Sequence, residues 1–223
     1  MVVAMHLLLT LSVLLVAAKR ELVESKVRVL ADAGLNAMAV DVDAFALHNA
    51  FELNYPEATT GTVVLVNIGH EVTNVNIVED GIPILTRDIS TGTRRIHEDL
   101  QRDRGLGSDE AEALLRGFDR SEHLDAVLEA RGEEIAVGVE RALAFLASSS
   151  RSGGQVNGVY VCGGGSRAPG LLEALGDRLR MSVQPANPLA NLVVRDGAFG
   201  SLVTDEVAPL LMLPLGLALR KPA

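Results

Sequence analysis

The chain has 223 residues, a formal net charge of −9, 48% hydrophobic residues and 22% charged residues, a composition typical of a globular protein with one large or two small domains. The acidic balance and the scattered basic residues argue against a nucleic-acid binder, and 3% aromatic residues without tryptophan argue against base-stacking platforms. The single cysteine, Cys162, excludes an internal disulfide and a cysteine-rich metal site, and it is typical of a reducing cytoplasm.

The first 18 residues are mostly apolar and are followed by Lys19 and Arg20. A secretory signal carries its positive charge before the apolar stretch, so this order disfavours one. A membrane span would be at the lower limit of length. We expect residues 11–18 to form a buried strand, with a signal peptide and a membrane anchor as the alternatives.

Helical and extended patterns then alternate. Apolar residues at helical spacing predict a helix over residues 21–33 that stops at Gly34. A short strand over residues 38–42 follows, and Asp43 is expected to cap a second helix that ends before Pro56.

Residues 62–89 predict a three-stranded antiparallel meander. Its strands are expected at residues 62–69, 73–78 and 82–89, and Asp80-Gly81 between the last two is a strong hairpin signal. Because a meander interrupts the alternation of strands and helices, the sheet is not purely parallel. The sequence therefore predicts a mixed-sheet α/β protein.

The rest of the chain is predicted to be helical apart from one returning strand. The apolar run at residues 159–162 is expected to join the sheet of the meander, and residues 148–154 are expected to form a flexible joint. The predicted helices lie at about residues 93–104, 109–116, 122–150, 169–179, 191–203 and 209–219, with a strand remnant at 183–184.

The hairpin at Asn67–Thr73 is the first candidate binding feature. Backbone amides of Gly69, His70 and Glu71, with the Thr73 hydroxyl, are suited to gripping a phosphate, because Gly69 has no side chain to keep an oxyanion away. An ordinary surface hairpin is an equally good interpretation of this segment taken alone.

A second turn, Gly163-Gly164-Gly165-Ser166, follows the returning strand. Its spacing fits neither a P-loop nor a dinucleotide fingerprint, and Ser166 lacks a nucleophile elbow. The alternative is a tight strand-to-helix turn, although three glycines exceed what such a turn needs. We expect this turn and Gly69–Glu71 to open toward one cleft, with the positive end of the following helix directed at the glycines.

Glu112 and Arg116 lie one turn apart on a short predicted helix, where they can form a solvated ion pair. A functional alternative is that they reach a ribose and an adenine edge. The five histidines show no metal spacing, and no Ser/His/Asp arrangement is recognisable.

Segments along most of the chain carry a family resemblance. They are Val13–Arg20, Ala33–Leu35, Val40–Leu47, Asn67–Gly81, Ala111-Glu112, Cys162–Ser166, Pro169–Leu171 and Gly216–Arg220. Together they resemble PilM, the actin-like, FtsA-related family of type IV pilus assembly, in register from about Leu11 to the carboxyl terminus. The resemblance implies an actin-like/Hsp70-type ATPase fold in which ATP and Mg²⁺ bind between two halves.

Carried over by position, Gly69–Thr73 is expected to be the second phosphate hairpin, Glu112 and Arg116 to face the ribose and base, and Gly163–Ser166 to form the adenosine loop. The family's Gly-Gly after the third strand is here Gly92-Thr93. The candidate nucleotide-binding residues are therefore Asn67, Gly69, His70, Glu71, Thr73, Gly92, Glu112, Arg116, Gly163, Gly164, Gly165 and Ser166.

The resemblance also implies partners and a location. Members bind the short cytoplasmic tail of PilN at the cytoplasmic face of the inner membrane and couple the membrane complex to other pilus platform and motor proteins. We accordingly expect a cytoplasmic protein, peripheral to the inner membrane, that contacts the membrane only through partners, does not bind nucleic acid and can self-associate.

The departures from the family pattern are informative. Asn67 stands where the family usually has Asp, so it is expected to hold Mg²⁺ only weakly, through water. Arg116 replaces a usual Lys, and Pro214 falls in a final helix that is normally uninterrupted. The first phosphate hairpin and most of the first subdomain have no counterpart, so the chain is expected to be amino-terminally truncated.

We therefore expect residues 1–58 to be a remnant of the first actin-like domain, and residues 59–223 to be the second, with a helical insert at about 93–152. The expected function is a nucleotide-binding scaffold of pilus assembly that binds ATP weakly and hydrolyses it negligibly. The alternatives are an FtsA-like cell-division protein or other actin-superfamily member, a sugar or acid kinase, for which no catalytic carboxylate is found, and a remnant without nucleotide binding.

Overall fold

The computed structural model describes residues 16–119, 121–149 and 155–220. It contains two compact units, one ending at Val40 and one beginning at Asp41. Helix α2 (Asp43–Asn54) packs with the sheet of the second unit, through Leu47, Ala50 and Phe51. The compact units thus divide at residue 40 and not at 58, while the assignment of residues 1–58 and 59–223 to two actin-like domains stays a prediction.

The first unit contains one helix, α1 (Arg20–Asp32), among its described residues. This confirms the predicted helix, and Gly34 ends it in the left-handed conformation at φ +76°. The predicted strand over 38–42 is wrong: this segment is irregular, and no strand among the described residues pairs with it. The strand expected over 11–18 lies mostly outside the described residues, and 16–18 are irregular.

The second unit is built on one five-stranded sheet with the order β3-β2-β1-β4-β5. The strands are β1 (Thr62–Ile68), β2 (Thr73–Glu79), β3 (Ile82–Ile89), β4 (Gly158–Cys162) and β5 (Val183–Pro185). The predicted antiparallel meander is confirmed, and so is the joining of the returning strand, because β4 pairs parallel with β1.

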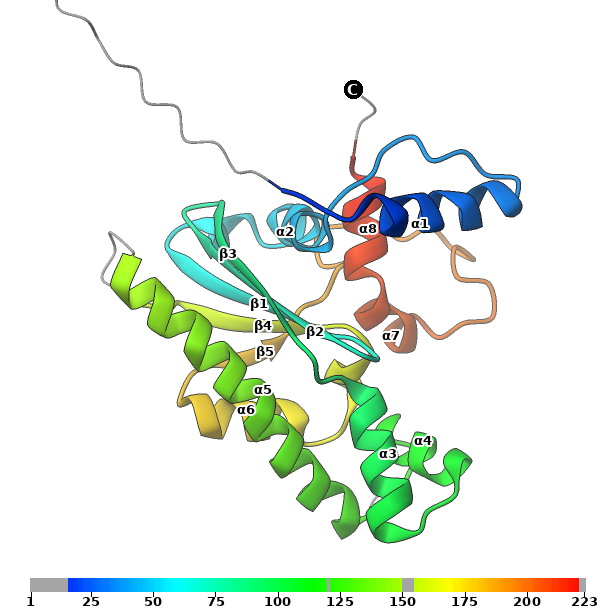
Figure 1. Ribbon diagram of the computed structural model, residues 1–223, viewed down its shortest axis with the longest axis vertical. Coiled ribbons are helices and arrows are strands. Elements are labelled where there is room, and N and C mark those ends of the chain that lie inside the picture. Colours follow the sequence, from blue (N-terminus) through cyan, green and yellow to red (C-terminus); the bar gives the residue numbers. More distant parts are fainter. Residues whose placement is uncertain (1–15, 120, 150–154, 221–223) are drawn as a thin grey trace, which may run out of the picture. The chain divides into compact units, whose positions relative to one another are not determined.

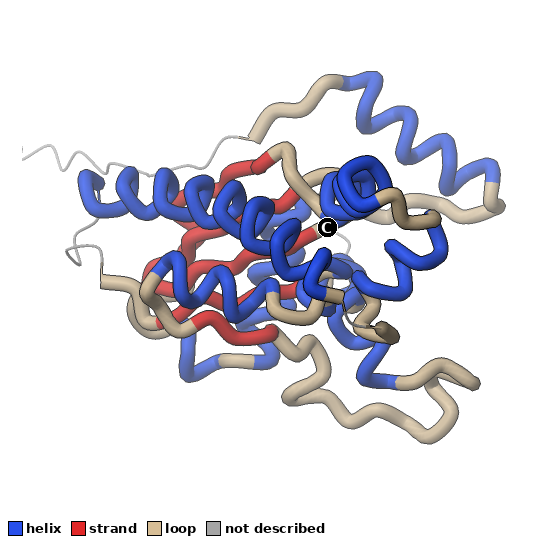
Figure 2. Tube along the Cα trace, turned by 90° about the horizontal axis from the view of Figure 1, so that it is seen from below, coloured by secondary structure: helices blue, strands red, loops and turns tan. Residues whose placement is uncertain are grey.

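Helices cover both faces of this sheet (Figures 1 and 2). Alternate residues of β1 show why: Val64 and Val66 pack in the core beneath α5, whereas Val63 and Leu65 pack in the core beneath α2. A strand that is buried on both sides needs a nearly continuous apolar sequence, which β1 has. The edge strand β3 instead alternates between partly buried and exposed positions.

The helical layer beside the sheet confirms the predicted helices. It comprises α3 (Thr93–Arg104), α4 (Ser108–Leu115), α5 (Glu122–Ser149) and α6 (Leu171–Leu179). Gly105, at φ +69°, ends α3 as expected. Neither Asp43 nor Ser108 acts as a cap, because each is the first helical residue and makes no capping bond. The joint expected at 148–154 falls mostly outside the described residues.

The end of the chain departs from the prediction. No helix forms over residues 191–203, where Gly197 and Gly200 have positive φ angles and the chain makes successive turns. Short helices follow at α7 (Thr204–Val207) and α8 (Met212–Ala218). Because α8 begins at Met212, Pro214 lies in its first turn, where the missing amide hydrogen has no helical partner to lose.

Helices α2 and α8 bring the two ends of the second unit together. Gly216 lies directly against α2, and a Cβ atom at this position would come within 2.9 Å of the Ala46 Cα and closer still to its carbonyl. The Arg220 guanidinium donates to the Asp41 carboxylate at 2.8 Å. This hydrogen bond lowers the pKa of Asp41 below its ordinary value, so the pair stays charged.

Candidate functional site

The two glycine-containing turns lie side by side at one edge of the sheet. Strands β1 and β4 are parallel neighbours in which Asn67 is in register with Cys162, so the carboxyl ends of both strands lie next to each other. A Cβ atom at Gly163 would lie 2.5 Å from both the Asn67 Oδ1 and the Ile68 carbonyl oxygen. The turns are therefore close together, and their opening toward one cleft stays a prediction. Ligands of α/β sheets commonly bind at this edge.

Helix α3 holds the hairpin turn, Gly69–Val72, in place. The amides of Thr93 and Arg94, the first two of the helix, donate to the carbonyls of Gly69 and His70 at 3.0 and 2.8 Å. Gly92 permits this approach, since a Cβ there would lie 2.6 Å from the Gly69 carbonyl oxygen. The positive end of α3 therefore stabilises the turn's own carbonyl groups.

This arrangement leaves fewer hydrogen-bond donors of the hairpin free to bind a phosphate. The Gly69 amide donates to the Val72 carbonyl at 3.0 Å, and the buried Thr73 hydroxyl donates to the Thr91 carbonyl at 2.7 Å. Both groups were predicted to face a phosphate, and in this structure they hold the turn instead. The amides of His70 and Glu71 belong to exposed residues, and the Glu71 carboxylate pairs with Arg94 at 3.5 Å.

The glycine turn, Gly163–Ser166, is shaped differently. Residues Gly164–Arg167 form a short 3-10 helix, in which the Ser166 amide and hydroxyl both donate to the Gly163 carbonyl, at 3.1 and 2.8 Å. The Gly163 amide donates to the Pro209 carbonyl at 2.9 Å. The regular helix α6 begins at Leu171, close to Pro169 as predicted, and the 3-10 turn lies between it and β4.

The three glycines of this turn have unequal roles. Gly163 is in the left-handed region at φ +85° and is pressed against β1, and a Cβ at Gly165 would overlap the Ile68 side chain. Gly164 is exposed, and a Cβ there would make only an ordinary contact with Leu210 at 3.4 Å. Gly164 is therefore the position at which a ligand can approach the backbone.

Asn67 lies between the two turns and is already engaged by protein groups. Its Nδ2 donates to the Asn74 Oδ1 at 3.0 Å, and its Oδ1 accepts from the Cys162 thiol at 3.7 Å. A neutral amide in this setting is a poor ligand for Mg²⁺. No group of three His, Cys, Asp or Glu side chains that could hold a metal ion occurs among the described residues.

Glu112 and Arg116 form the expected ion pair on α4, and both side chains are about half exposed. Helix α4 ends near the segment that follows the glycine turn, since a Cβ at Gly117 would lie 3.2 Å from the ring of Pro169. Ala111 and Leu114 anchor the opposite face of α4 in the core. The end of this helix thus lies next to Pro169, but among the described residues no hydrogen bond or ion pair joins Glu112 or Arg116 to Gly163–Ser166.

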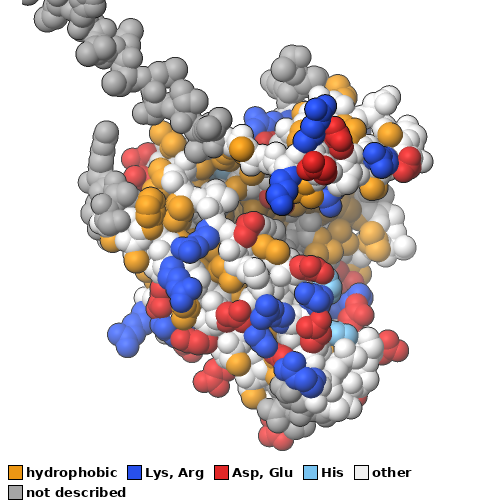
Figure 3. All heavy atoms as spheres, viewed as in Figure 1, with side chains coloured by type: hydrophobic (Ala, Val, Ile, Leu, Met, Phe, Trp, Pro, Cys, Tyr) orange, Lys and Arg blue, Asp and Glu red, His pale blue; other side chains and the backbone are white. Residues whose placement is uncertain are grey.

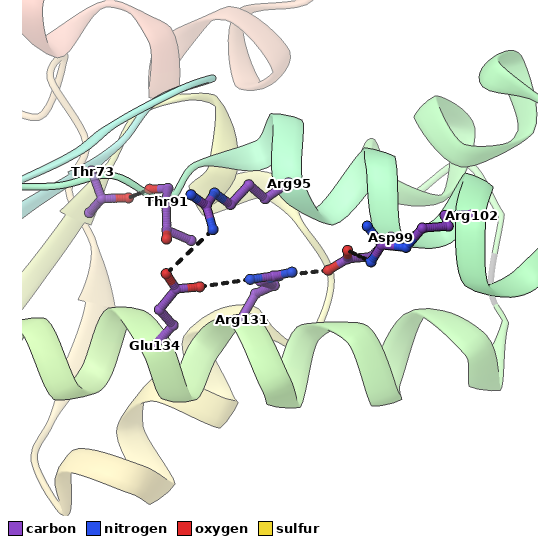
Figure 4. Close-up of polar contacts among 7 residues, drawn as sticks. All are labelled: Thr73, Thr91, Arg95, Asp99, Arg102, Arg131 and Glu134. Carbon is purple, nitrogen blue, oxygen red and sulfur yellow. Dashed lines mark hydrogen bonds and ion pairs between the residues drawn. The ribbon is translucent and has the colours of Figure 1, made fainter.

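Charged residues that sequence reasoning missed connect α3 to α5 (Figure 4). The buried Asp99 carboxylate accepts from Arg131 at 2.6 Å and from Arg102 at 2.7 Å. Arg131 also donates to Glu134 at 2.8 Å, and Glu134 lies 3.9 Å from Arg95. The spacings of Asp99 to Arg102 and of Arg131 to Glu134 were visible in the sequence, whereas the pairing across helices was not.

The charge state of this network follows from its contacts. Burial raises the pKa of Glu134, but hydrogen bonds, including the one from Arg131, and the charges of Arg131 and Arg95 outweigh burial and lower the pKa overall. The hydrogen bond with Asp99 raises the pKa of Arg131. Basic and acidic side chains are interspersed over the helical part of the face shown in Figure 3, so this surface has no single-sign patch.

Comparison with known proteins gives the family. A model described as "Type IV pilus assembly protein PilM" matches residues 9–222. A solved structure titled "PilM-PilN type IV pilus biogenesis complex" is similar with 26% identity and a TM-score of 0.78, covering 91% of this chain and 58% of that one.

Two further structures show the same fold. The ethanolamine utilization protein EutJ from Carboxydothermus hydrogenoformans matches with 24% identity and a TM-score of 0.66, covering 91% of this chain and 62% of EutJ. MreB5 of Spiroplasma citri, solved bound to AMPPNP, matches with 14% identity and a TM-score of 0.61, covering 91% and 65%. The fold is thus actin-like, as predicted. No helix in the described part of the chain is long and apolar enough to span a membrane.

Proposed function

The chain belongs to the PilM family of type IV pilus assembly proteins, and we propose that it is an actin-like, nucleotide-binding scaffold of pilus assembly. The observation that carries the nucleotide part is the pairing of β1 with β4, which sets the hairpin turn and the glycine turn next to each other at the carboxyl ends of parallel strands. Because the chain spans 58% of the PilM structure that it matches, its activity and partners are proposals.

The two turns fit an adenine nucleotide in complementary ways. The amides of His70 and Glu71 offer donors to a phosphate, and the open backbone at Gly164 allows a flat or charged group to approach. We assign the ribose and base to the side of α4, the helix that carries Glu112 and Arg116 and is followed by Gly117 next to Pro169. The AMPPNP of MreB5 is in keeping with an adenine nucleotide as ligand.

Mg²⁺ fits the site less well. Asn67, the residue at the strand end, is neutral, and both its oxygen and its nitrogen bond to protein groups. No step of the proposed function passes through a metal. The scaffold is proposed to bind ATP without appreciable turnover, since binding alone needs only donors that are already in place.

The proposed partner is a cytoplasmic PilN segment, at the cytoplasmic face of the inner membrane. The solved PilM structure that matches this chain was obtained as a complex with PilN. Other pilus platform and motor proteins are proposed as further partners, with contact to the membrane through these proteins.

A titration with a fluorescent ATP analogue tests the nucleotide site. We expect a saturable signal with a dissociation constant of roughly 0.1 mM, about 5.5 kcal/mol of binding free energy, because only a few donors remain available. Gly164→Asp places a negative charge where a phosphate-bearing ligand approaches, and it should weaken binding at least about tenfold without a change in folding.

Gly107→Asp is the matched control, because a Cβ atom added to this glycine, which precedes α4 in another turn, would meet nothing within 4 Å. It should leave affinity unchanged. A wild-type chain that gives no saturable response at millimolar ATP, or a Gly164→Asp variant with wild-type affinity, would contradict a nucleotide site at these turns.

A further inference from the structure

A ladder of polar side chains crosses four strands beside the two turns. The Cys162 thiol on β4 donates to the Asn67 Oδ1 on β1 at 3.7 Å. The Asn67 amide nitrogen donates to the Asn74 Oδ1 on β2 at 3.0 Å, and the Asn74 nitrogen donates to the Asp88 carboxylate on β3 at 2.8 Å. Strand register accounts for the ladder, since Asn67 pairs with both Asn74 and Cys162, and Asn74 pairs with Asp88.

The direction of the ladder is fixed at both ends. An ionised carboxylate only accepts hydrogen bonds, so Asp88 requires the nitrogen of Asn74 to face it. The Asn74 oxygen then faces Asn67 and requires its nitrogen, which leaves the Asn67 oxygen toward Cys162. Burial raises the pKa of the Cys162 thiol to about 12, so the sulfur keeps its hydrogen and can donate.

Asn67 is the member of the ladder that lies between both turns. It is two residues before Gly69, it is in register with the residue before Gly163, and it is in register with Asn74, which follows Thr73 at the other end of the hairpin. The Asn67 oxygen also lies against the backbone of Gly163, where it leaves no room for a Cβ atom. A change in the position of this amide would therefore displace one turn relative to the other.

We propose that Asn67 is the positioning residue that sets the two turns relative to each other, and that Asp88, acting through Asn74, fixes the orientation of its amide. This inference rests on the proposed function in one respect: the turns that Asn67 positions are those proposed to bind the nucleotide. Asn67 acts through neighbouring groups and needs no direct contact with a ligand.

The ladder makes an unusual prediction about paired substitutions. In Asn67→Asp, residues 67 and 88 both only accept, so Asn74, which has one donor side and one acceptor side, can satisfy only one of them. In Asn67→Asp with Asp88→Asn, the ladder can reverse: residue 88 donates to Asn74, and Asn74 donates to residue 67. The Cys162 thiol still finds an acceptor at residue 67.

Thermal unfolding and titration with the fluorescent ATP analogue test the proposal together. Asn67→Asp should lower the melting temperature by about 4 °C or more and weaken binding about tenfold. Asp88→Asn alone should change little, because an amide can still accept from Asn74. The double variant should regain most of the lost melting temperature and affinity.

The matched control uses Asn74→Asp, in which residues 74 and 88 both only accept: Asp88→Asn then supplies a donor to residue 74, whereas Asp88→Leu removes the same charge and supplies none. If Asp88→Leu rescues as well as Asp88→Asn, relief of charge repulsion explains the result and the ladder is overturned. If neither substitution rescues, the ladder is overturned too. Should Asn67→Asp not fold, the Asn74→Asp comparison alone decides, because it predicts rescue by Asp88→Asn and not by Asp88→Leu.

Failure of the nucleotide proposal gives a different result. If the wild-type chain does not bind ATP, the proposed nucleotide site is ruled out. The rescue of the melting temperature still decides whether the ladder exists. In that case nuclear magnetic resonance provides the second readout: the side-chain NH₂ signal of residue 88 should be protected from exchange in Asn67→Asp with Asp88→Asn, where it donates to Asn74, and unprotected in Asp88→Asn alone, where residue 88 only accepts from Asn74.

Discussion

The hairpin turn and the glycine turn occupy the same edge of the sheet, yet different forces hold them. Hydrogen bonds from the first amides of α3 fix the hairpin turn, so its shape depends on a neighbouring helix. Close packing against β1 shapes the glycine turn, whose first and third glycines have no room for a side chain. The hairpin turn is therefore sensitive to changes in the helix that anchors it, whereas the glycine turn is sensitive to a single methyl group added within it.

The largest effect is expected at Gly163, where the steric account of the glycine turn can be tested. Gly163→Ala should cost about 3 kcal/mol, because a side chain there adopts a positive φ and collides with Asn67 and the Ile68 carbonyl. Urea unfolding measures this cost. Gly164→Ala is the matched control and should change stability by less than about 1 kcal/mol, since its Cβ meets only Leu210. Equal costs at both positions would remove the steric explanation.

Gly92→Ala tests the anchoring of the hairpin turn by α3. A Cβ there lies too close to the Gly69 and His70 carbonyls, so the helix must retreat, at a cost of about 2 kcal/mol. Hydrogen exchange should show that the amides of Thr93 and Arg94 lose protection while the Ser166 amide in the glycine turn keeps it. Equal loss in both turns would show that they form one cooperative unit.

Thr73→Val removes a single hydrogen bond from the same anchoring region. The side chain keeps its shape, but the Thr91 carbonyl loses the donor at 2.7 Å, and we expect a destabilisation of about 1.5 kcal/mol. Thr59→Val is the control, because the Thr59 hydroxyl bonds to Pro56 at an exposed site. Urea unfolding of both variants gives the comparison, and identical results for the two would show that the buried bond adds nothing.

The smallest expected effect is a pH dependence of stability that is confined to the hairpin turn and the helix α3 that anchors it. The folded-state pKa of Glu134 is lower than its ordinary value of 4.5, so its contribution is complete above about pH 4.5 and is lost as the pH falls through the lowered value. Glu134→Gln should flatten the stability curve in this range, as measured by urea unfolding between about pH 3 and 6.

Glu57→Gln is the control for this prediction, because Glu57 is exposed on a short 3-10 helix away from the network. As the pH is lowered, the Thr93 amide should lose its protection from hydrogen exchange at a higher pH than the Ser166 amide does, since Glu134 supports α3 through Arg95 and Arg131. Loss of protection at the same pH for both amides would contradict a separate anchoring of the two turns.

Much of the sheet was predictable because each strand carries its own signal. The meander follows from the alternation around Asp80-Gly81, whose positive φ angles suit a two-residue hairpin turn, and the burial of β1 and β4 follows from their apolar runs. The failures lie where local pattern is weak. Residues 191–203 contain enough apolar residues to suggest a helix, but Gly197 and Gly200 bend the chain repeatedly.

The site was predictable in position but not in detail. Sequence placed Gly69 and Gly163 at strand ends, and parallel pairing then brought them together. It could not show that the Gly69 amide and the Thr73 hydroxyl are already bonded within the protein, because those partners depend on how α3 meets the hairpin. The link between Asn67 and Asp88 depends on register across three strands, which no single segment encodes.

The contact between α2 and α8 makes residues 41–220 a candidate for circular permutation. Asp41 and Arg220 are bonded at 2.8 Å, so a short linker between these two ends would close the segment into a ring with little loss of chain entropy. New ends opened in the exposed turns near Gly197 would leave every strand pairing intact. A probe or a tether fixed at the new ends would then be attached through a surface turn, and the linker would join the ends of the segment next to α2 and α8 covalently.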